Sequence, residues 1–414
     1  MPQEGLSFLY RSSASSSRLS RHRRRRLTSS LIQPGFAIAR FAIEGMAKRS
    51  RKKNKQRVPS LSDDLLFDIL SRVPYRSLCR FKCVSRSWLA LCSDPGVRKK
   101  SPQTLSGFFC HSRDRDDDKL HFLNLSGRGR PLVDPSPPLP EGYEGPQLAD
   151  CCSSLLLWKF YKLSPFDPDY LVCNPATRKW TLLPATEPRH PANFARLGFD
   201  PSTPSCFYVF MFPTKLTGLE IYSSQTGGWI FRKSEWGDET NVDIQMTSVF
   251  YNGTLYAITT DLSVVTVDIE GKTWRKIRLP HSNVQFGFID DEPFIAHSQG
   301  HLYAMYIDFY HDNLLSVWAV EEDGNEPWTL KHSVSISELF GRQRRVKGEF
   351  YTLIAAHPER NMIFLTGGMP DEYKLMSCDL DTRQVHVICA MQEYFLSPCF
   401  PYIPCFVEWS SDGP

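Results

Sequence analysis

The chain has 414 residues, of which 41% are hydrophobic and 13% aromatic, a composition typical of a globular protein with two or three domains. Its formal charge of +4 is unevenly distributed, because residues 1–58 hold fifteen lysines and arginines against two acidic residues, so the remaining chain has more acidic than basic residues. No apolar run approaches the roughly 18–20 residues that a membrane helix needs, which argues against a membrane-spanning helix.

Residues 1–58 are rich in Ser and Arg, poor in acids and without sustained periodicity, so we expect a disordered basic tail. Its basic clusters at residues 21–26 and 48–57 are typical of nuclear localisation signals, but a solvated tail has the same composition. We expect the protein in the nucleus, the cytoplasm or both. Two alternatives stay open: residues 1–45 share the composition of an organellar transit peptide, or Met46 is the physiological start.

An apolar stripe with helical spacing follows the tail and predicts a helix over residues 62–72. Ser62 is a plausible N-cap, and Pro74 ends the run because it cannot donate a helical hydrogen bond. The stripe consists of Leu61, Leu65, Leu66, Ile69, Leu70 and Val73. Two more short helices are expected, the last closed at residues 94–96. A unit of fewer than about 40 residues buries too little to stand alone, so we expect it to lean on a partner.

The run from Leu61 to Trp88 resembles an F-box of the plant type, in which an opening Leu-Pro, an acidic pair, an Ile-Leu, a second Leu-Pro, a Ser-Leu and a Val-x-x-x-Trp recur in that order. Ser62 stands where that family usually has proline, and Val73 where it usually has leucine. The resemblance implies a three-helix F-box over residues 59–97 that binds a Skp-family adaptor, with Val84 and Trp88 also in its own core. The residues that it assigns to adaptor binding are Leu61, Leu65, Ile69, Leu70, Pro74, Leu78, Val84 and Trp88.

Short strands rich in aromatic and β-branched residues fill residues 101–409, which makes the chain mainly β. A unit made of a strand, a polar turn and a tryptophan that opens another strand recurs in this region. The tryptophans of this repeat are Trp180, Trp229, Trp274 and Trp328, spaced by 49, 45 and 54 residues. Such spacing indicates β-propeller blades, about six of them, in which the tryptophans pack between neighbouring blades. Asn252-Gly253 predicts a tight hairpin turn, and residues 401–409 are expected to pair with the first blade.

The same region resembles the F-box-associated, kelch-like propeller domain of plant F-box proteins, on the motifs CNPATRKWTLLP from Cys173 and GFDPSTPSCFYVF from Gly198. We find no motif for catalysis or metal binding, and we expect no cofactor. His297 and His301 have the spacing of helical metal ligands, but they flank Gln299-Gly300 in an expected hairpin. The twelve cysteines include no Cys-x-x-Cys pair, and with no secretory segment ahead of them we expect reduced thiols.

The two resemblances imply the substrate-recognition subunit of an SCF-type ubiquitin ligase. The F-box would bind the Skp adaptor, and through it the cullin and RING subunits, while the propeller holds a target protein for ubiquitination and proteasomal degradation. Such a chain is not an enzyme, because it acts by proximity. The alternative is a Skp-binding interaction or regulatory protein that does not drive degradation. Only the basic tail suggests a nucleic-acid-binding protein, and the excess of acidic residues in the remaining chain disfavours that function.

Overall fold

The structure of the chain is a computed structural model, and it describes most residues from Leu61 onward. The described residues are 61–100, 104–112, 120–125, 136, 142–162, 168–185, 192–201, 206–213, 218–237, 240–280, 293–308, 313–321, 327–343, 346–369, 372–391 and 395–406. The predicted basic tail over residues 1–58, with both basic clusters and Met46, lies outside these residues. None of the described helices is long and apolar enough to cross a membrane.

A unit of short helices comes first. Its members are α2 (Asp63–Ser71), α3 (Tyr75–Phe81), α4 (Arg86–Ser93) and α5 (Pro95–Lys100). The Ser62 hydroxyl accepts a hydrogen bond from the Leu65 backbone N–H at 3.3 Å, which confirms the predicted N-cap of α2. Ser85 caps α4 in the same way, through the backbone N–H of Trp88 at 3.2 Å.

Helix α5 corrects the expectation of three helices. Residues 94–96 do end α4, but they also start a further helical turn. The Asp94 carboxylate accepts hydrogen bonds from the backbone N–H groups of Gly96 at 2.8 Å and Val97 at 3.3 Å. Pro95 then occupies the first position of α5, where its missing N–H costs nothing. Val97 is fully buried, and α5 contacts α2, so this turn completes the core of the helical unit.

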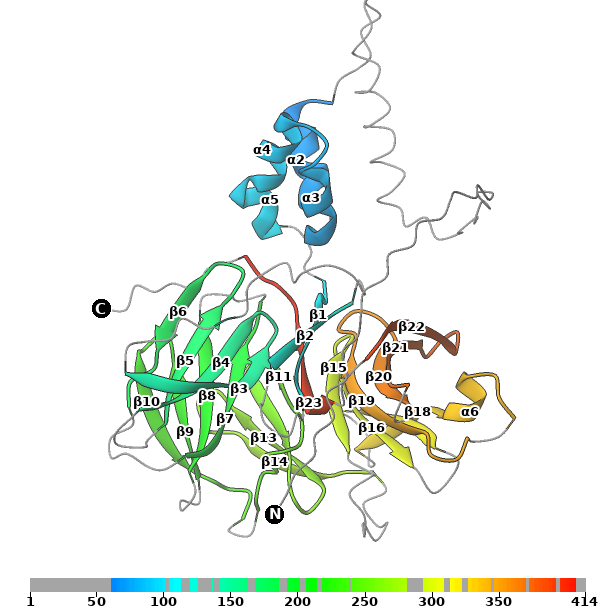
Figure 1. The fold of residues 1–414 in the computed structure, drawn as a ribbon. Coiled ribbons are helices and arrows are strands. Elements are labelled where there is room, and N and C mark those ends of the chain that lie inside the picture. Colours follow the sequence, from blue (N-terminus) through cyan, green and yellow to red (C-terminus); the bar gives the residue numbers. More distant parts are fainter. Residues whose placement is uncertain are drawn as a thin grey trace, which may run out of the picture. The chain divides into compact units, whose positions relative to one another are not determined.

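Six antiparallel sheets make up the rest of the described chain (Figure 1). The first two four-stranded sheets are β3 (Tyr143–Cys152), β4 (Leu155–Lys162), β5 (Pro168–Asn174) and β6 (Lys179–Leu182), then β7 (Ala192–Phe199), β8 (Phe207–Pro213), β9 (Gly218–Ser223) and β10 (Gly228–Lys233). The next is β11 (Ser248–Tyr251), β12 (Thr254–Ile258), β13 (Ser263–Asp268) and β14 (Trp274–Arg278). The fourth sheet is β15 (Phe294–Ser298), β16 (His301–Asp308), β17 (Leu314–Val320) and β18 (Trp328–Ser335), and the short helix α6 (Ile336–Leu339) follows β18 in the chain. The fifth is β19 (Phe350–Ala356), β20 (Met362–Gly368), β21 (Lys374–Asp379) and β22 (Gln384–Ala390).

The sixth sheet joins the two ends of the strand region and has the order β2 (Leu120–Asn124), β1 (Gly107–Ser112), β23 (Phe395–Tyr402). We call it the closing sheet. Its strand β23 pairs antiparallel with β1, with Gly107 opposite Tyr402. The predicted closure by the C-terminal strand is therefore confirmed, although the strand begins and ends earlier than residues 401–409. Phe109 of β1 packs against Phe122 and Tyr402, with ring centroids 4.8 and 5.3 Å away, so aromatic contacts reinforce the pairing.

The sheets are arranged as the blades of a ring. The strands β3, β7, β11, β15, β19 and β23 form its inner layer, and each contacts the inner strands of both neighbours. Six clusters of buried apolar side chains lie between the blades, one for each pair of neighbours. A single small sheet has two apolar faces, and stacking the blades buries both of them. The predicted six-bladed β-propeller is thus confirmed.

Two tight turns follow the sequence expectation. Asn252 and Gly253, with φ of 48° and 71°, connect β11 to β12, as an Asn-Gly hairpin does. Gln299 and Gly300, with φ of 49° and 83°, connect β15 to β16 in a second hairpin. His297 and His301 therefore lie on paired strands and not on a helix. No group of three or more possible ligands in the described residues has the geometry to hold a metal ion.

Candidate functional site

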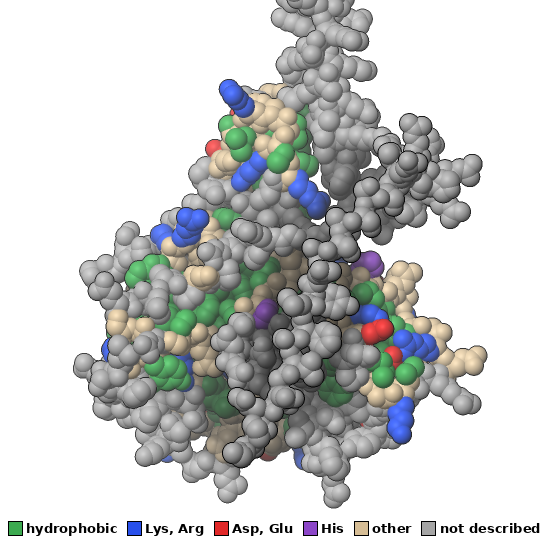
Figure 2. Space-filling view, in the orientation of Figure 1, with side chains coloured by type: hydrophobic (Ala, Val, Ile, Leu, Met, Phe, Trp, Pro, Cys, Tyr) green, Lys and Arg blue, Asp and Glu red, His purple; other side chains and the backbone are tan. Residues whose placement is uncertain are grey.

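The outer side of the helical unit carries exposed leucines. Leu65 lies in the first turn of α2 and is 54% exposed, Leu61 precedes the helix and is also exposed, and Ile69 is half-buried one turn after Leu65. Leu65 and Ile69 are four residues apart, so they lie on the same side of the helix. Figure 2 shows apolar and basic side chains together on the visible surface of this unit. In a unit this small, only part of the apolar stripe is buried in its own core.

The inner side of the same stripe is buried. Leu70 and Leu78 have almost no exposed surface, and the Trp88 ring lies edge-on against Phe81 with 5.6 Å between centroids. The sequence resemblance assigns Leu70, Leu78 and Trp88 to the adaptor and Trp88 also to the core of the unit, and the structure places all three inside the helical unit. Their role is corrected to holding α2, α3 and α4 in place, because a side chain that contacts no solvent has no surface left for a partner.

Val84 and Leu89 complete the exposed apolar side chains of the unit. Val84 was expected in the core, but it lies between α3 and α4 and is exposed. Leu89 was not among the predicted adaptor residues and is 48% exposed. It follows the buried Trp88 directly, so it points about 100° away from the core. Pro74 is half-buried at the start of α3. We call Leu61, Leu65, Val84 and Leu89 the exposed apolar set.

Two of the repeat tryptophans join neighbouring blades through a hydrogen bond. The Trp229 indole N–H on β10 donates to the Pro184 carbonyl, which follows β6 of the preceding blade, at 2.8 Å. The Trp328 indole N–H on β18 donates in the same manner to the Arg278 carbonyl at the end of β14, at 2.9 Å. Each ring also covers apolar surface between the blades. Trp274 lies edge-on against Trp236, with 4.8 Å between ring centroids, in the cluster between its blade and the preceding one.

Trp180 departs from the expected blade-packing role, since it is 50% exposed. Its position on β6 is equivalent to that of Trp229 on β10, because each opens the outermost strand of its blade. The blade that precedes Trp180 is the closing sheet, which has three strands in the described residues. No described fourth strand therefore offers a carbonyl and an apolar edge beside Trp180. The difference comes from its neighbour and not from its own strand.

We expect Trp328→Phe to lower the free energy of unfolding of the propeller by about 1–3 kcal/mol, because the Arg278 carbonyl loses its indole donor and some packing around the buried Trp328 ring is lost. The same substitution at Trp180 should change it by less than about 0.5 kcal/mol. Urea unfolding followed by fluorescence and circular dichroism measures both. Equal effects at the two positions would contradict the assigned difference between these tryptophans.

Comparison with known families gives one match for the helical unit and one for the propeller. Residues 58–100 match a family described as "F-box domain", and residues 208–405 match one described as "F-box protein At3g26010-like, beta-propeller". The chain therefore carries an F-box domain followed by a β-propeller of the type found in F-box proteins. The family expected from the sequence is thereby confirmed. The name kelch-like, and the predicted boundaries at residues 59–97 and 101–409, stay predictions.

Named relatives of this F-box protein come from a plant. It is 28% identical over 325 residues to "F-box protein At5g07610" of Arabidopsis thaliana, a match that covers 70% of this chain and 74% of the relative. It is 24% identical over 310 residues to "F-box protein At5g49610" of the same organism, covering 67% and 80%. Among solved structures, the WD40 domain of SCAP from fission yeast aligns with a TM-score of 0.33 at 14% identity, over 63% of this chain and 60% of that one. That likeness is too low to carry an argument.

Proposed function

We propose that this F-box protein is the substrate-recognition subunit of an SCF-type ubiquitin ligase. In this proposal the F-box binds a Skp-family adaptor, which connects it to cullin and RING subunits. The propeller holds a target protein near the ubiquitin-conjugating enzyme. The observation that carries the proposal is the exposed apolar set on a helical unit that matches the F-box family. Four large apolar side chains exposed on a helical unit of 40 described residues offer a surface for a partner to cover.

Hydrophobic burial supplies the expected affinity for the adaptor. Full burial of a leucine contributes roughly 1.5–3 kcal/mol, and about half of that remains available at a half-exposed position. Leu61, Leu65 and Leu89 are each about half exposed. Together with the half-buried Ile69 and Pro74, they offer several kcal/mol to a complementary apolar groove. The buried Leu70, Leu78 and Trp88 support this surface from beneath by fixing the angles of the helices.

The propeller is suited to holding a target because its frame is rigid and its loops emerge at the ends of the ring. Six apolar clusters lock the blades together, so the loops are presented from fixed positions. In the proposed assembly the chain performs no chemistry of its own. It raises the effective concentration of the target's lysines at the conjugating enzyme, which is a contribution of proximity and orientation.

The experiment that tests the function uses the full chain with an affinity tag, expressed in plant cells, and a matched chain carrying Leu65→Asp and Ile69→Asp. Mass spectrometry of the captured proteins should find the adaptor and cullin with the first chain only, while target proteins should be captured by both. The half-lives of those targets should be shorter in cells with the unaltered chain. If the unaltered chain captures no Skp-family adaptor, the proposal is wrong. If it captures the adaptor but target half-lives do not change, the protein is instead a Skp-binding regulator.

A further inference from the structure

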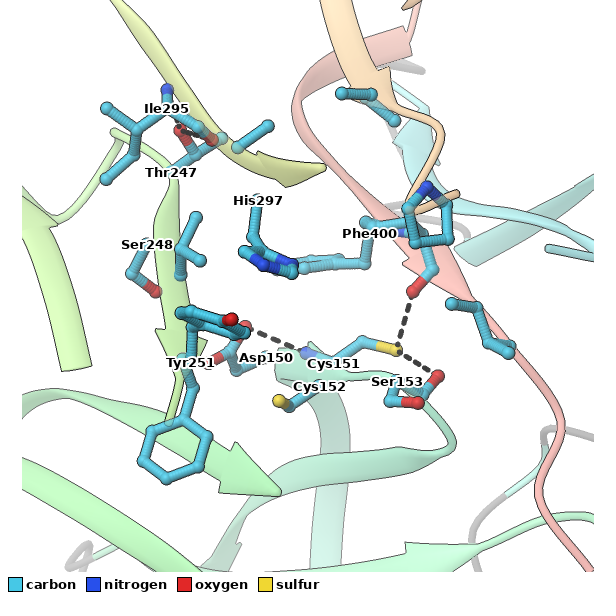
Figure 3. Close-up of a pocket in the computed structure, with 18 of the residues that line it drawn as sticks. Asp150, Cys151, Cys152, Ser153, Thr247, Ser248, Tyr251, Ile295, His297 and Phe400 are labelled. Atoms are coloured by element: carbon cyan, nitrogen blue, oxygen red, sulfur yellow. Dashed lines mark hydrogen bonds between the residues drawn. The ribbon is translucent and has the colours of Figure 1, made fainter. Parts of the chain in front are cut away.

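A cavity of about 480 Å³ lies at one end of the ring, where the inner strands run into their hairpins. All six blades contribute to its wall. One lining residue from each inner strand is Asp150 (β3), Arg196 (β7), Tyr251 (β11), His297 (β15), Ala356 (β19) and Phe400 (β23). We call this cavity the channel pocket (Figure 3). Its volume lies within the roughly 300–1,000 Å³ of small-molecule sites and is far larger than an ordinary packing defect.

Apolar side chains make up most of the wall of the channel pocket. Aromatic rings of Phe199, Phe250, Phe294 and Phe400 line it, together with the flexible thioether of Met246. The imidazole of His297 stacks on the phenol ring of Tyr251, with 3.7 Å between ring centroids. Figure 3 shows the Tyr251 side chain next to that of Asp150. Flat apolar surfaces of this kind favour a ligand that contains rings.

Three charged residues line the pocket, the buried Asp150 and Arg196 and the half-buried Asp200. The two carboxylate oxygens of Asp150 accept hydrogen bonds from the backbone N–H groups of Cys151 at 2.8 Å and Leu197 at 2.7 Å. Burial raises the pKa of the Asp150 carboxyl, while the positive charge of Arg196 and the two N–H donors oppose that rise. Because both oxygens accept hydrogen bonds, we assign the ionised carboxylate. With Arg196 and the second acidic lining residue, Asp200, the pocket has no excess of positive charge to attract an anion.

Arg196 itself is held rigidly. Its Nη2 atom donates to the backbone carbonyls of Ile244 at 2.9 Å and Met246 at 3.1 Å. Burial lowers the pKa of the guanidinium, and the negative charges of Asp150 and Asp243 oppose that fall. These two hydrogen bonds use only the Nη2 atom of the guanidinium. Its Nε atom is buried and has no hydrogen-bond partner.

Two further buried polar atoms of the lining residues lack a partner, namely the hydroxyl of Ser153 and Nε2 of His297. Burial lowers the pKa of His297, and His301 acts in the same direction, so the imidazole is neutral near pH 7. A neutral imidazole and a hydroxyl can each donate or accept a hydrogen bond. Unsatisfied buried polar groups are rare in folded proteins and call for an explanation. A ligand in the adjoining cavity supplies that explanation, because small rotations of Ser153 and His297 bring their polar atoms within its reach.

We propose that the channel pocket is a binding site for a neutral, largely apolar small molecule that contains rings and carries one or two hydrogen-bonding groups. An anionic ligand is disfavoured because the lining residues, two acidic and one basic, offer no excess of positive charge, and the mostly apolar wall favours a neutral molecule. Rings match the aromatic wall, and the hydrogen-bonding groups match Ser153 and His297. The proposal is independent of the F-box, because every lining residue belongs to the propeller or, at Leu105, to the residue pair before its first strand.

Fluorescence titration of the full chain with N-phenyl-1-naphthylamine tests the proposal, since this neutral amine with three aromatic rings emits strongly only in apolar surroundings. Its sulfonated analogue 8-anilinonaphthalene-1-sulfonate has similar rings and a negative charge. We expect saturable binding of the neutral probe at one site per chain, at least about tenfold tighter than that of the anionic probe, a difference of about 1.4 kcal/mol. Non-saturable binding, or equal or tighter binding of the anionic probe, would overturn the proposal.

Variants that fill the channel pocket test whether the neutral probe binds there. Ser248→Phe places a ring at a half-buried lining position on β11, and we expect it to weaken binding of the neutral probe at least about tenfold. Ser333→Phe makes the same change at an exposed position on β18 and should leave binding unchanged. Ala356→Leu on β19 is a smaller filling change to be used if circular dichroism shows that Ser248→Phe does not fold. Unaltered binding in a folded pocket variant would place the probe elsewhere and contradict the site.

Discussion

Replacing Leu65 by aspartate is expected to weaken binding of a purified Skp-family adaptor at least about 100-fold, while the F-box stays folded. The loss has two sources: the burial of a half-exposed leucine, and the cost of bringing a carboxylate into an apolar interface. Together these exceed the 2.8 kcal/mol or so that a 100-fold change represents. Leu65 lies at the third position of α2, near the positive end of the helix dipole, so an aspartate there does not destabilise the helix. Isothermal titration calorimetry measures the affinity, and circular dichroism checks the fold.

A matched control comes from the propeller. Leu330 on β18 is 45% exposed, close to the exposure of Leu65, and Leu330→Asp should leave the adaptor affinity within about twofold of the unaltered chain. Leu78→Asp is a contrasting change, since Leu78 is fully buried and its replacement should unfold the helical unit. Adaptor binding that survives Leu65→Asp would show that the exposed apolar set is not the adaptor surface.

We expect Phe109→Ala to lower the free energy of unfolding of the propeller by about 3–5 kcal/mol and its melting temperature by about 6 °C or more. Phe109 is almost fully buried in the closing sheet, where its ring contacts Phe122 and Tyr402. A cavity at this place also weakens the pairing of β1 with β23, which alone joins the first and last strands of the ring. Differential scanning calorimetry of the full chain measures the propeller transition.

Phe231→Ala removes the same ring from an exposed position on β10 and should change the free energy of unfolding by less than about 0.5 kcal/mol. The ratio between the two variants is the informative quantity, because both delete the same atoms. A similar loss of stability from both would mean that closure of the ring contributes no more than a surface contact does. The helical unit should keep its adaptor affinity in both variants.

Local patterns were sufficient to predict the F-box but not which of its leucines face outward. The stripe from Leu61 to Val73 spans about half of the helix circumference, and its spacing does not say which part contacts α3, α4 and α5. Contacts between helices bury Leu66 and Leu70 and leave Leu65 exposed. The turn at residues 94–96 shows the same limit, because Asp-Pro-Gly ends one helix and also suits the start of another, and only the burial of Val97 decides between them.

The repeat of strand, turn and tryptophan was enough to predict blades, their approximate number and the role of the last strand. The repeat predicts the same packing between blades for Trp180 and Trp328, since each opens an outer strand after a polar turn. Their different exposures depend on whether the preceding blade has a fourth strand beside the ring, and that neighbour is about 50 residues away or at the other end of the chain. A local pattern contains no information about it.

The channel pocket had no sequence signal at all. Asp150, Arg196, Tyr251 and His297 stand on four different blades, about 45–55 residues apart, and none belongs to a recognisable motif. Periodicity and repeat spacing report on contacts within one helix or one sheet, and these were sufficient for the F-box stripe and the propeller. The closed ring alone brings the ends of all six inner strands together, so it decides which polar groups are buried side by side and where a cavity remains.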